Sequence, residues 1–198
     1  MGPEESAGIR ALEYSELPGE LQDAFRSRYE RLGYLGGFFR YGSHQPGAIL
    51  AFHEFTEALK RALPAELSEV VALTVASTLG NRYERHQHER LAIKLGLGRD
   101  VVAALVGPEA QPAILDARQL AVRKLALMAV TGAGRDCNSQ LEELVMLVGP
   151  ETAMGVLLLI ARYAAHALVA NALELQPPVP SIFEQPATDE AAKAHSGG

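Results

Sequence analysis

Apolar residues recur at helical spacing along most of the chain, and no segment shows the strict alternation of apolar and polar residues that is typical of a half-buried strand. Ala and Leu dominate the sequence, and both lose little side-chain freedom in a helix. Hydrophobic residues make up 48% of the 198 positions, which is enough for one substantial core. The sequence therefore predicts one all-α domain.

Glycine and proline interrupt this periodicity and set the expected helix boundaries. Pro64 opens one amphipathic segment and Gly80 ends it, while Gly96 stops the next. The expected helices cover residues 18–32, 64–80, 81–95, 100–106, 116–130, 138–148 and 150–173. One further helix is expected to begin at residues 44–46 and to run to about residue 59. Residues 1–17 are expected to form a loosely held arm, 18–175 the helical domain and 176–198 a flexible Pro-rich tail.

Charge and cysteine content exclude some classes of function. The formal net charge of −6 provides no basic field for a phosphate backbone, so we expect no nucleic-acid partner. A lone cysteine, Cys137, cannot form an internal disulfide or a CxxC redox pair. The N-terminus, MGPEESAGIR, is acidic and lacks the apolar region of a secretory signal, which favours a cytoplasmic protein.

The most apolar segment, Met154 to Leu173, has about the length of a membrane span. However, four polar or charged residues interrupt it: Arg162, Tyr163, His166 and Asn171. We therefore expect a helix that is buried on most sides or at a subunit interface, and no membrane association.

A constellation of polar residues lies at the start of the expected helix 81–95. Asn81, Glu84 and His88 stand at positions i, i+3 and i+7 and so share one helix face. The same face continues into an apolar stripe formed by Leu91, Ala92 and Leu95. Ionisable groups beside a buried stripe are costly unless they are paired or used in chemistry.

Structural interpretations of these residues stay open. Asn81 followed by Glu84 resembles a capping box, in which both side chains satisfy amides at the start of the helix. His88 alone is compatible with a core histidine that makes one local hydrogen bond. Glu69, in the preceding helix, either turns to solvent or faces the neighbouring helix. In the second case its carboxylate could meet Glu84 and His88 across the helix contact.

The stretch LSEVVALTVASTLGNRYERHQHERLAIKLGLGRDVVAALV, residues 67–106, resembles the central motif of the carboxymuconolactone decarboxylase and alkylhydroperoxidase D-like families. The peroxidase branch carries a Glu and then CxxCxxxH. Here Glu69 matches the Glu, Asn81 and Glu84 replace the two cysteines, and His88 matches the histidine. NRYERHQH resembles the N-x-Y-E-W-x-x-H pattern of a Cys-free branch, with Arg85 in place of Trp.

This resemblance covers roughly residues 9–175 and implies a helical bundle of the alkylhydroperoxidase D-like type that assembles as a trimer or hexamer. It implies no cofactor and a small-molecule substrate. Thiol peroxidase activity is not expected, because Cys137 lies in a different helix from the motif.

The resemblance also implies a reaction. Loss of CO₂ from a lactone acid leaves an electron-rich enolate that must be protonated. Our hypothesis is that His88 transfers this proton while Glu69 or Glu84 orients its ring. This predicts a cofactor-independent decarboxylase, lyase or isomerase for a small lactone or carbonyl acid. The alternatives are a hydrolase or elimination enzyme on the same scaffold and a non-catalytic helical oligomer that binds a small molecule.

Other residues are candidates for contacts with the substrate. The predicted substrate-binding set consists of Asn81, Tyr83, Arg40, Tyr163 and His166. Arg40 would bind a substrate carboxylate, and Tyr163 and His166 would complete the pocket or an oligomer contact. Tyr83 and His86 fall on another helix face, which we expect to be exposed or at an interface. His44 and His53 are expected to have structural roles.

A metal centre is the sharpest competing hypothesis. His86 and His88 cannot chelate one ion from a helix, because their side chains diverge by roughly 200°. Glu69, Glu84 and His88 together form a carboxylate-rich set that could bind a metal. We expect proton transfer, and no metal, at this set.

Overall fold

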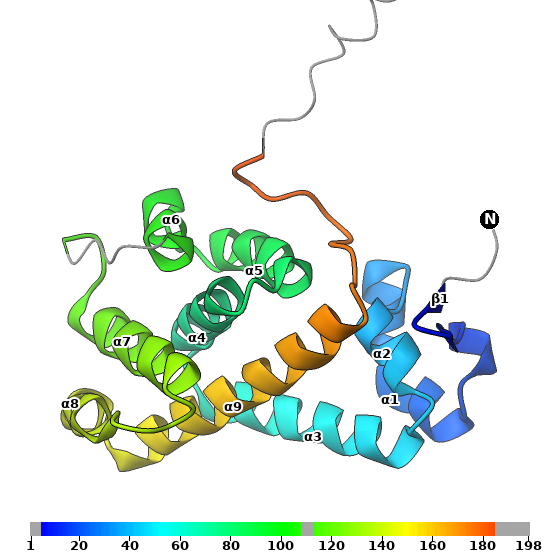
Figure 1. The fold of residues 1–198 in the computed structure, drawn as a ribbon, viewed down its shortest axis with the longest axis horizontal. Coiled ribbons are helices and arrows are strands. Elements are labelled where there is room, and N and C mark those ends of the chain that lie inside the picture. The colour runs from blue at the N-terminus through cyan, green and yellow to red at the C-terminus, as the bar shows by residue number, and fades with distance from the viewer. Residues whose placement is uncertain (1–4, 108–112, 185–198) are drawn as a thin grey trace, which may run out of the picture.

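The computed structural model describes residues 5–107 and 113–184, and this part of the chain is mainly helical (Figure 1). Two short strands, β1 (Glu5–Ser6) and β2 (Ile9–Arg10), pair as an antiparallel hairpin before a 3-10 turn, η1 (Tyr14–Glu16). The helices are α1 (Gly19–Leu32), α2 (Gly37–Gly42), α3 (Pro46–Ala62), α4 (Ala65–Thr78), α5 (Arg82–Lys94), α6 (Arg99–Val106), α7 (Ala117–Thr131), α8 (Asn138–Val148) and α9 (Pro150–Ala172).

The predicted all-helical fold is confirmed, and most expected helices begin and end within a few residues of their predicted positions. Sequence periodicity missed α2 and the β1–β2 hairpin. A helix of six residues and strands of two residues are too short to show a period. Asn81 starts α5 as predicted, because its side-chain oxygen accepts a hydrogen bond from the Glu84 amide at 3.2 Å.

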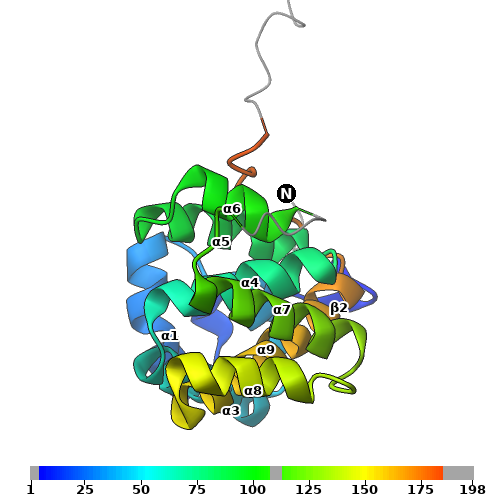
Figure 2. The ribbon, with the colours of Figure 1, turned by 90° about the vertical axis from the view of Figure 1, so that its left-hand side faces the viewer.

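Helix α4 is the centre of the domain. Every residue from Leu67 to Ala76 is buried, since α5, α6, α7 and α9 all pack against it. Figure 2 shows α5 and α6 above α4 and α7, with α8, α9 and α3 below. A polar side chain in the middle of α4 therefore has no route to solvent except through the neighbouring helices.

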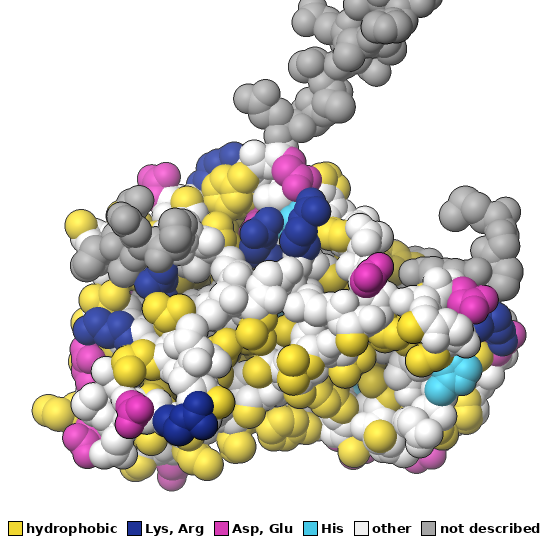
Figure 3. Space-filling view, viewed as in Figure 1, with side chains coloured by type: hydrophobic (Ala, Val, Ile, Leu, Met, Phe, Trp, Pro, Cys, Tyr) yellow, Lys and Arg dark blue, Asp and Glu magenta, His cyan; other side chains and the backbone are white. Residues whose placement is uncertain are grey.

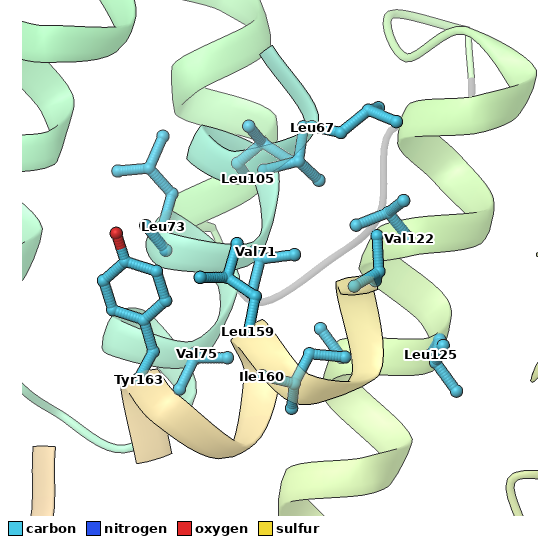
Figure 4. Packing of buried hydrophobic residues seen from close by; sticks show 14 of the residues in the cluster. Leu67, Val71, Leu73, Val75, Leu105, Val122, Leu125, Leu159, Ile160 and Tyr163 are labelled. Carbon is cyan, nitrogen blue, oxygen red and sulfur yellow. The ribbon is translucent and has the colours of Figure 1, made fainter. Parts of the chain in front are cut away.

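Branched aliphatic side chains from α4, α6, α7 and α9 form the main core (Figure 4). Leu73, Leu125 and Leu159 are fully buried there. Burial of such a side chain contributes about 1.5–3 kcal/mol relative to exposure. Tyr163 lies at one edge of this core and carries a hydroxyl group into its surroundings. The apolar packing thus ends at a polar residue that belongs to the candidate site.

A second, aromatic cluster joins α1, α2 and α3 to the N-terminal segment. Phe25 packs against Phe39, with ring centroids 4.9 Å apart, and Tyr83 of α5 reaches into the same cluster. Ala11 and Leu17 are buried in it. Residues 5–17, expected to be a loosely held arm, are therefore packed against the helices, because their small and apolar side chains complete this cluster.

Residues 179–184, which we call the C-terminal strap, run over α5 and α6 in hydrogen-bonded contact. His86 Nδ1 donates to the Val179 carbonyl at 3.2 Å, and Arg90 Nη2 donates to the Pro180 carbonyl at 2.9 Å. The Glu89 carboxylate accepts bonds from Ser181 Oγ at 2.6 Å and the Ile182 amide at 3.0 Å. This differs from the flexible tail expected from residue 176 onward; residues 185–198 lie outside the described residues.

Helix α9 is long and apolar enough to cross a membrane, but half of its most apolar window is buried. It packs against α3, α4, α7 and α8, as a core helix does. Its outer side adds exposed apolar residues, among them Leu168 and Met154, and Figure 3 shows apolar side chains gathered over α9 and α3. The expected homo-oligomer stays a prediction to which this surface is suited.

The strap gives the first prediction. Glu89→Ala removes the acceptor of the Ser181 hydroxyl and the Ile182 amide, so strap residues should detach from α5. We expect faster hydrogen exchange at the Ile182 amide and a loss of about 1–3 kcal/mol in the free energy of unfolding. Glu151→Ala, at an exposed position in the first turn of α9, is the control. Unchanged exchange at Ile182 in Glu89→Ala would contradict the role of the carboxylate.

Candidate active site

The His88 imidazole lies between two carboxylates from different helices. Its Nδ1 is 2.7 Å from Glu69 Oε2 on α4, and its Nε2 is 3.1 Å from Glu84 Oε2 one turn earlier on α5. Glu69 faces inward because small residues flank it on α4, and its side chain is 6% exposed. The two packed helices therefore bring together the three residues that the sequence singled out as catalytic.

This arrangement favours a protonated imidazole. Burial alone would lower the pKa of His88, but the charges and hydrogen bonds of Glu69, and then those of Glu84, outweigh it and raise the pKa to about 9. With both ring nitrogens facing carboxylate oxygens, each nitrogen carries a proton and donates it. At neutral pH His88 is therefore a charged proton donor.

The second oxygen of Glu84 contacts another histidine. His166 Nε2 on α9 lies 3.1 Å from Glu84 Oε1, while Arg162 Nη1 lies 3.8 Å from Glu84 Oε2. Burial opposes the charge on Glu84, but His166, His88 and Arg162 together hold the pKa of this carboxyl well below its usual range. Burial lowers the pKa of His166 to about 4, with Glu84 opposing it, so His166 is neutral where His88 is charged.

Tyr163 completes the surroundings of His88. Its hydroxyl oxygen lies 3.4 Å from His88 Nε2, and the two rings meet edge to face with centroids 5.2 Å apart. Burial raises the pKa of Tyr163 above its usual range, so the phenol keeps its proton. His88 Nε2 thus faces both Glu84 and a neutral hydroxyl group, whereas Nδ1 faces Glu69.

A pocket of about 260 Å³ opens beside this cluster. His88, Glu84, Tyr163 and Arg162 line it, and Glu69 does not. The Nε2 side of the imidazole is therefore the side that a bound molecule can approach, while Glu69 holds the ring from behind. His88 itself is only 12% exposed, so the pocket leads to a group that is largely shielded from bulk water.

The rest of this pocket is strongly basic. Five cationic side chains line it: Arg28, Arg31, Lys60, Arg90 and Arg162. Arg162 is buried, donates from Nε to Thr56 Oγ1 at 2.9 Å, and has no hydrogen-bond partner for Nη1 among the described residues. The guanidinium of Arg28 lies 4.7 Å from the centre of the Phe39 ring, and burial lowers its pKa. This excess of positive charge suits an anion.

Four predicted substrate-binding residues lie outside this pocket lining, and two of them, Asn81 and Tyr83, hold neighbouring helices in place. Asn81 caps α5 and is buried. Tyr83 is also buried, and burial raises the pKa of its hydroxyl above the usual range. A Cβ at Gly36 would lie 2.6 Å from that hydroxyl, so only glycine leaves room for it. Asn81 and Tyr83 therefore position α5 and α2.

Arg40 was predicted to bind a substrate carboxylate, and the structure corrects this. Its Nε donates to the Leu12 carbonyl at 3.1 Å and its Nη2 to Glu13, so Arg40 holds the N-terminal segment. His86, expected to be exposed or at an interface, is buried against the strap. His166 contacts Glu84 from behind the pocket, and Tyr163 lines the pocket as predicted.

Sequence reasoning missed the cations of the pocket. Arg28, Lys60 and Arg162 come from α1, α3 and α9, and no spacing along the chain connects three different helices. Arg162 could have been identified from the sequence, because a charged residue in an otherwise apolar helix needs a partner or a function. In the sequence we interpreted Arg162 only as evidence against a membrane span.

The imidazole nitrogens bear on the metal hypothesis. A histidine ligand needs a nitrogen lone pair, yet both His88 nitrogens face carboxylate oxygens at hydrogen-bonding distance. Among residues 5–107 and 113–184, no group of three or more His, Cys, Asp and Glu residues is arranged to hold a metal ion.

Comparisons with known proteins locate the fold. No protein-family model and no curated protein matches the sequence. Solved structures do match: the debrominase Bmp8 in complex with 2,3,4-tribromopyrrole is 20% identical, with a TM-score of 0.73 over 87% of this chain and 93% of that chain. A peroxidase-related protein from a Silicibacter species is 19% identical, with a TM-score of 0.73 over 90% of this chain and 95% of that chain.

A third match is the alkylhydroperoxidase D core of a peroxidase-related protein from Ralstonia eutropha, 17% identical, with a TM-score of 0.73 over 84% of this chain and 90% of that chain. At these identities the likeness concerns the fold. The chain has the helical fold of the alkylhydroperoxidase D-like proteins, as the motif resemblance implied.

The histidine pKa gives the second prediction. A folded-state pKa of about 9, above the ordinary 6.5, means that the His88 contacts stabilise the protein fully below pH 6.5 and lose this effect as the pH rises to 9. The pH-dependent part is on the order of 3 kcal/mol. In chemical denaturation, the stability difference between the unchanged protein and His88→Gln should therefore shrink from pH 6.5 to 9.

His53→Gln is the matched control. Burial lowers the pKa of His53, so its contribution is constant above pH 6.5 and the stability difference should stay flat across the same window. If the stability difference between the unchanged protein and His88→Gln is also constant between pH 6.5 and 9, His88 is not held as an imidazolium.

Proposed function

We propose that this protein is a cofactor-independent enzyme that acts on a small lactone or carbonyl acid through an enol-type intermediate, with His88 as the proton donor. The observation that carries the proposal is the imidazole fixed between Glu69 and Glu84, with its Nε2 side at a basic pocket. A fixed donor that is charged at neutral pH suits protonation of a carbanion or enolate.

The proposed decarboxylation requires one proton from the protein. The bond between the substrate carboxylate carbon and the adjacent carbon breaks, CO₂ leaves, and the electron pair enters the neighbouring carbonyl system as an enolate. His88 Nε2–H gives its proton to that carbon and the ring becomes neutral. Glu69 keeps the Nδ1 proton in place, and a proton from solvent restores the imidazolium. An isomerisation would use the same donor after removal of a substrate proton.

The cations of the pocket support an acidic substrate. Arg162 Nη1 lies 3.8 Å from Glu84 and has no hydrogen-bond partner within the described part of the chain, and Arg28 and Lys60 add positive charge from α1 and α3. A guanidinium can bind a carboxylate through two parallel hydrogen bonds. Because Arg162 also lies beside Glu84 and Tyr163, an acid bound to it would be held next to His88.

The alternatives have weaker support. A hydrolase would need a neutral imidazole to activate water, and the pKa of His88 near 9 keeps the ring charged at neutral pH. A thiol peroxidase would need cysteines at this site, whereas Cys137 is buried at the start of α8 and donates to the Gly134 carbonyl. A non-catalytic binder would leave the proton donor unused, and a turnover assay separates it from an enzyme.

The third prediction concerns His88. With a panel of 3-oxo acids and carboxylated lactones in deuterated water, the unchanged protein should release CO₂ or isomerise at least one compound. Deuterium should enter the product at the protonated carbon, as seen by NMR. His88→Gln should lower kcat/KM by about 10²–10⁴-fold, the usual contribution of a positioned acid. Cys137→Ser, away from the pocket, should keep full activity.

Two outcomes would contradict the proposal. Unchanged turnover in His88→Gln would remove the proton donor from the reaction. Loss of turnover in Cys137→Ser, with the fold intact by circular dichroism, would point to thiol chemistry.

The fourth prediction concerns the basic pocket. Arg28→Met and Lys60→Met should each raise KM for an acidic substrate by roughly tenfold with a smaller change in kcat, because they weaken binding of the anion. Arg61→Met, one residue along α3 and lining a different pocket, is the control and should leave KM unchanged. An equal rise in KM for all three variants would show that the effect comes from the overall surface charge and not from this pocket.

A further inference from the structure

A second pocket, of about 270 Å³, lies between α4, α6 and α7. It shares no lining residue with the pocket beside His88. Apolar side chains form part of its wall, and Arg123 together with three hydroxyl residues of α4 forms the rest: Thr74, Ser77 and Thr78. Nothing in the proposed reaction uses this pocket.

Arg123 is the unusual feature of its wall. The side chain is only 5% exposed, and no ion pair joins it to a carboxylate of residues 5–107 or 113–184. Nη2 donates to the Gly107 carbonyl at 3.2 Å, while Nε has no hydrogen-bond partner among the residues that the structure describes. Burial lowers the pKa of Arg123. A buried guanidinium without a counter-charge is costly, and an apolar residue would fill the same space more cheaply.

The hydroxyl groups of α4 supply a second observation. Thr78 Oγ1 donates to the Thr74 carbonyl at 2.7 Å, and Ser77 Oγ donates to the Val106 carbonyl at 3.2 Å, so both protons are used. Thr74 Oγ1 is buried and has no partner in the described part of the chain. Arg123 and Thr74, both residues of the pocket wall, therefore carry buried donors that no described residue uses, and a molecule bound to them must provide acceptors.

We propose that this pocket binds a small oxyanion, a carboxylate or a phosphate group, through Arg123 and Thr74. Such an anion supplies a counter-charge that no described residue provides to Arg123, and it accepts the Thr74 hydroxyl proton. The apolar wall, which includes Leu105 and Leu127, accommodates a short carbon chain attached to the anionic group. The proposal is independent of the reaction at His88.

The test measures binding of inorganic phosphate and of acetate at constant ionic strength, with chloride as the reference ion. Titration calorimetry should detect an anion site that Arg123→Met abolishes, and the rise in melting temperature caused by phosphate should be smaller in this variant than in the unchanged protein. Without added anion, Arg123→Met should melt at the same or a higher temperature, because it removes an unpaired buried charge. Phosphate and acetate, as separate arms, identify which oxyanion binds more tightly.

Matched controls separate this site from other basic groups. Arg118→Met changes an exposed arginine of the same helix and should keep the site. Lys60→Met weakens the pocket beside His88 and should leave the Arg123 component intact. Thr74→Val should weaken anion binding several-fold, whereas Thr78→Val, which removes a hydroxyl whose proton is already used, should not.

Two outcomes would overturn the proposal. The first is an anion-induced shift in Arg123→Met equal to that of the unchanged protein. The second is a large loss of stability in Arg123→Met without anion, which would make the guanidinium a structural link to Gly107.

Discussion

The ion pairs of His88 with Glu69 and Glu84 are the interaction on which the rest of the site depends. They place a charged imidazole between α4 and α5 at a point where burial alone would favour the neutral ring. Removing either carboxylate would leave the buried imidazolium with one counter-charge in place of two, which destabilises the charged ring. The contact between α4 and α5 is therefore both a packing interface and the element that sets the proton-donating state of the site.

The polar residues of α5 divide between two sides of the helix. Glu84 and His88 face α4 and α9, whereas His86 and Glu89 hold the strap. The Arg85 Nε atom lies 3.3 Å from Glu89 Oε1 without the geometry of a hydrogen bond, and it adds charge to that second side. A helix this rich in buried polar groups is held by tertiary contacts on both sides, so its position is well defined.

Much of this architecture could be predicted from the sequence. Gly and Pro marked the helix ends, since they act locally, and the period of 3.6 residues placed Glu84 and His88 on one face. Whether Glu69 faced inward depended on how α4 packs, and only the structure decides that. The basic pocket and the buried Arg123 could not be predicted, because their members come from separate helices. Arg40 was assigned wrongly for the same reason: its partners Leu12 and Glu13 lie far away in sequence.

The C-terminal strap contributes to the pocket beside His88. Its first residue, Val179, forms part of the wall of the pocket beside His88, and Arg90 of the same pocket is tied to Pro180. Trimming the protein after the last helix, where the periodic sequence stops, would therefore widen the entrance and release a guanidinium from its carbonyl partner. A segment that the sequence marks as a dispensable tail therefore forms part of a pocket wall, and its length and sequence help to set the size of the molecule that this pocket can admit.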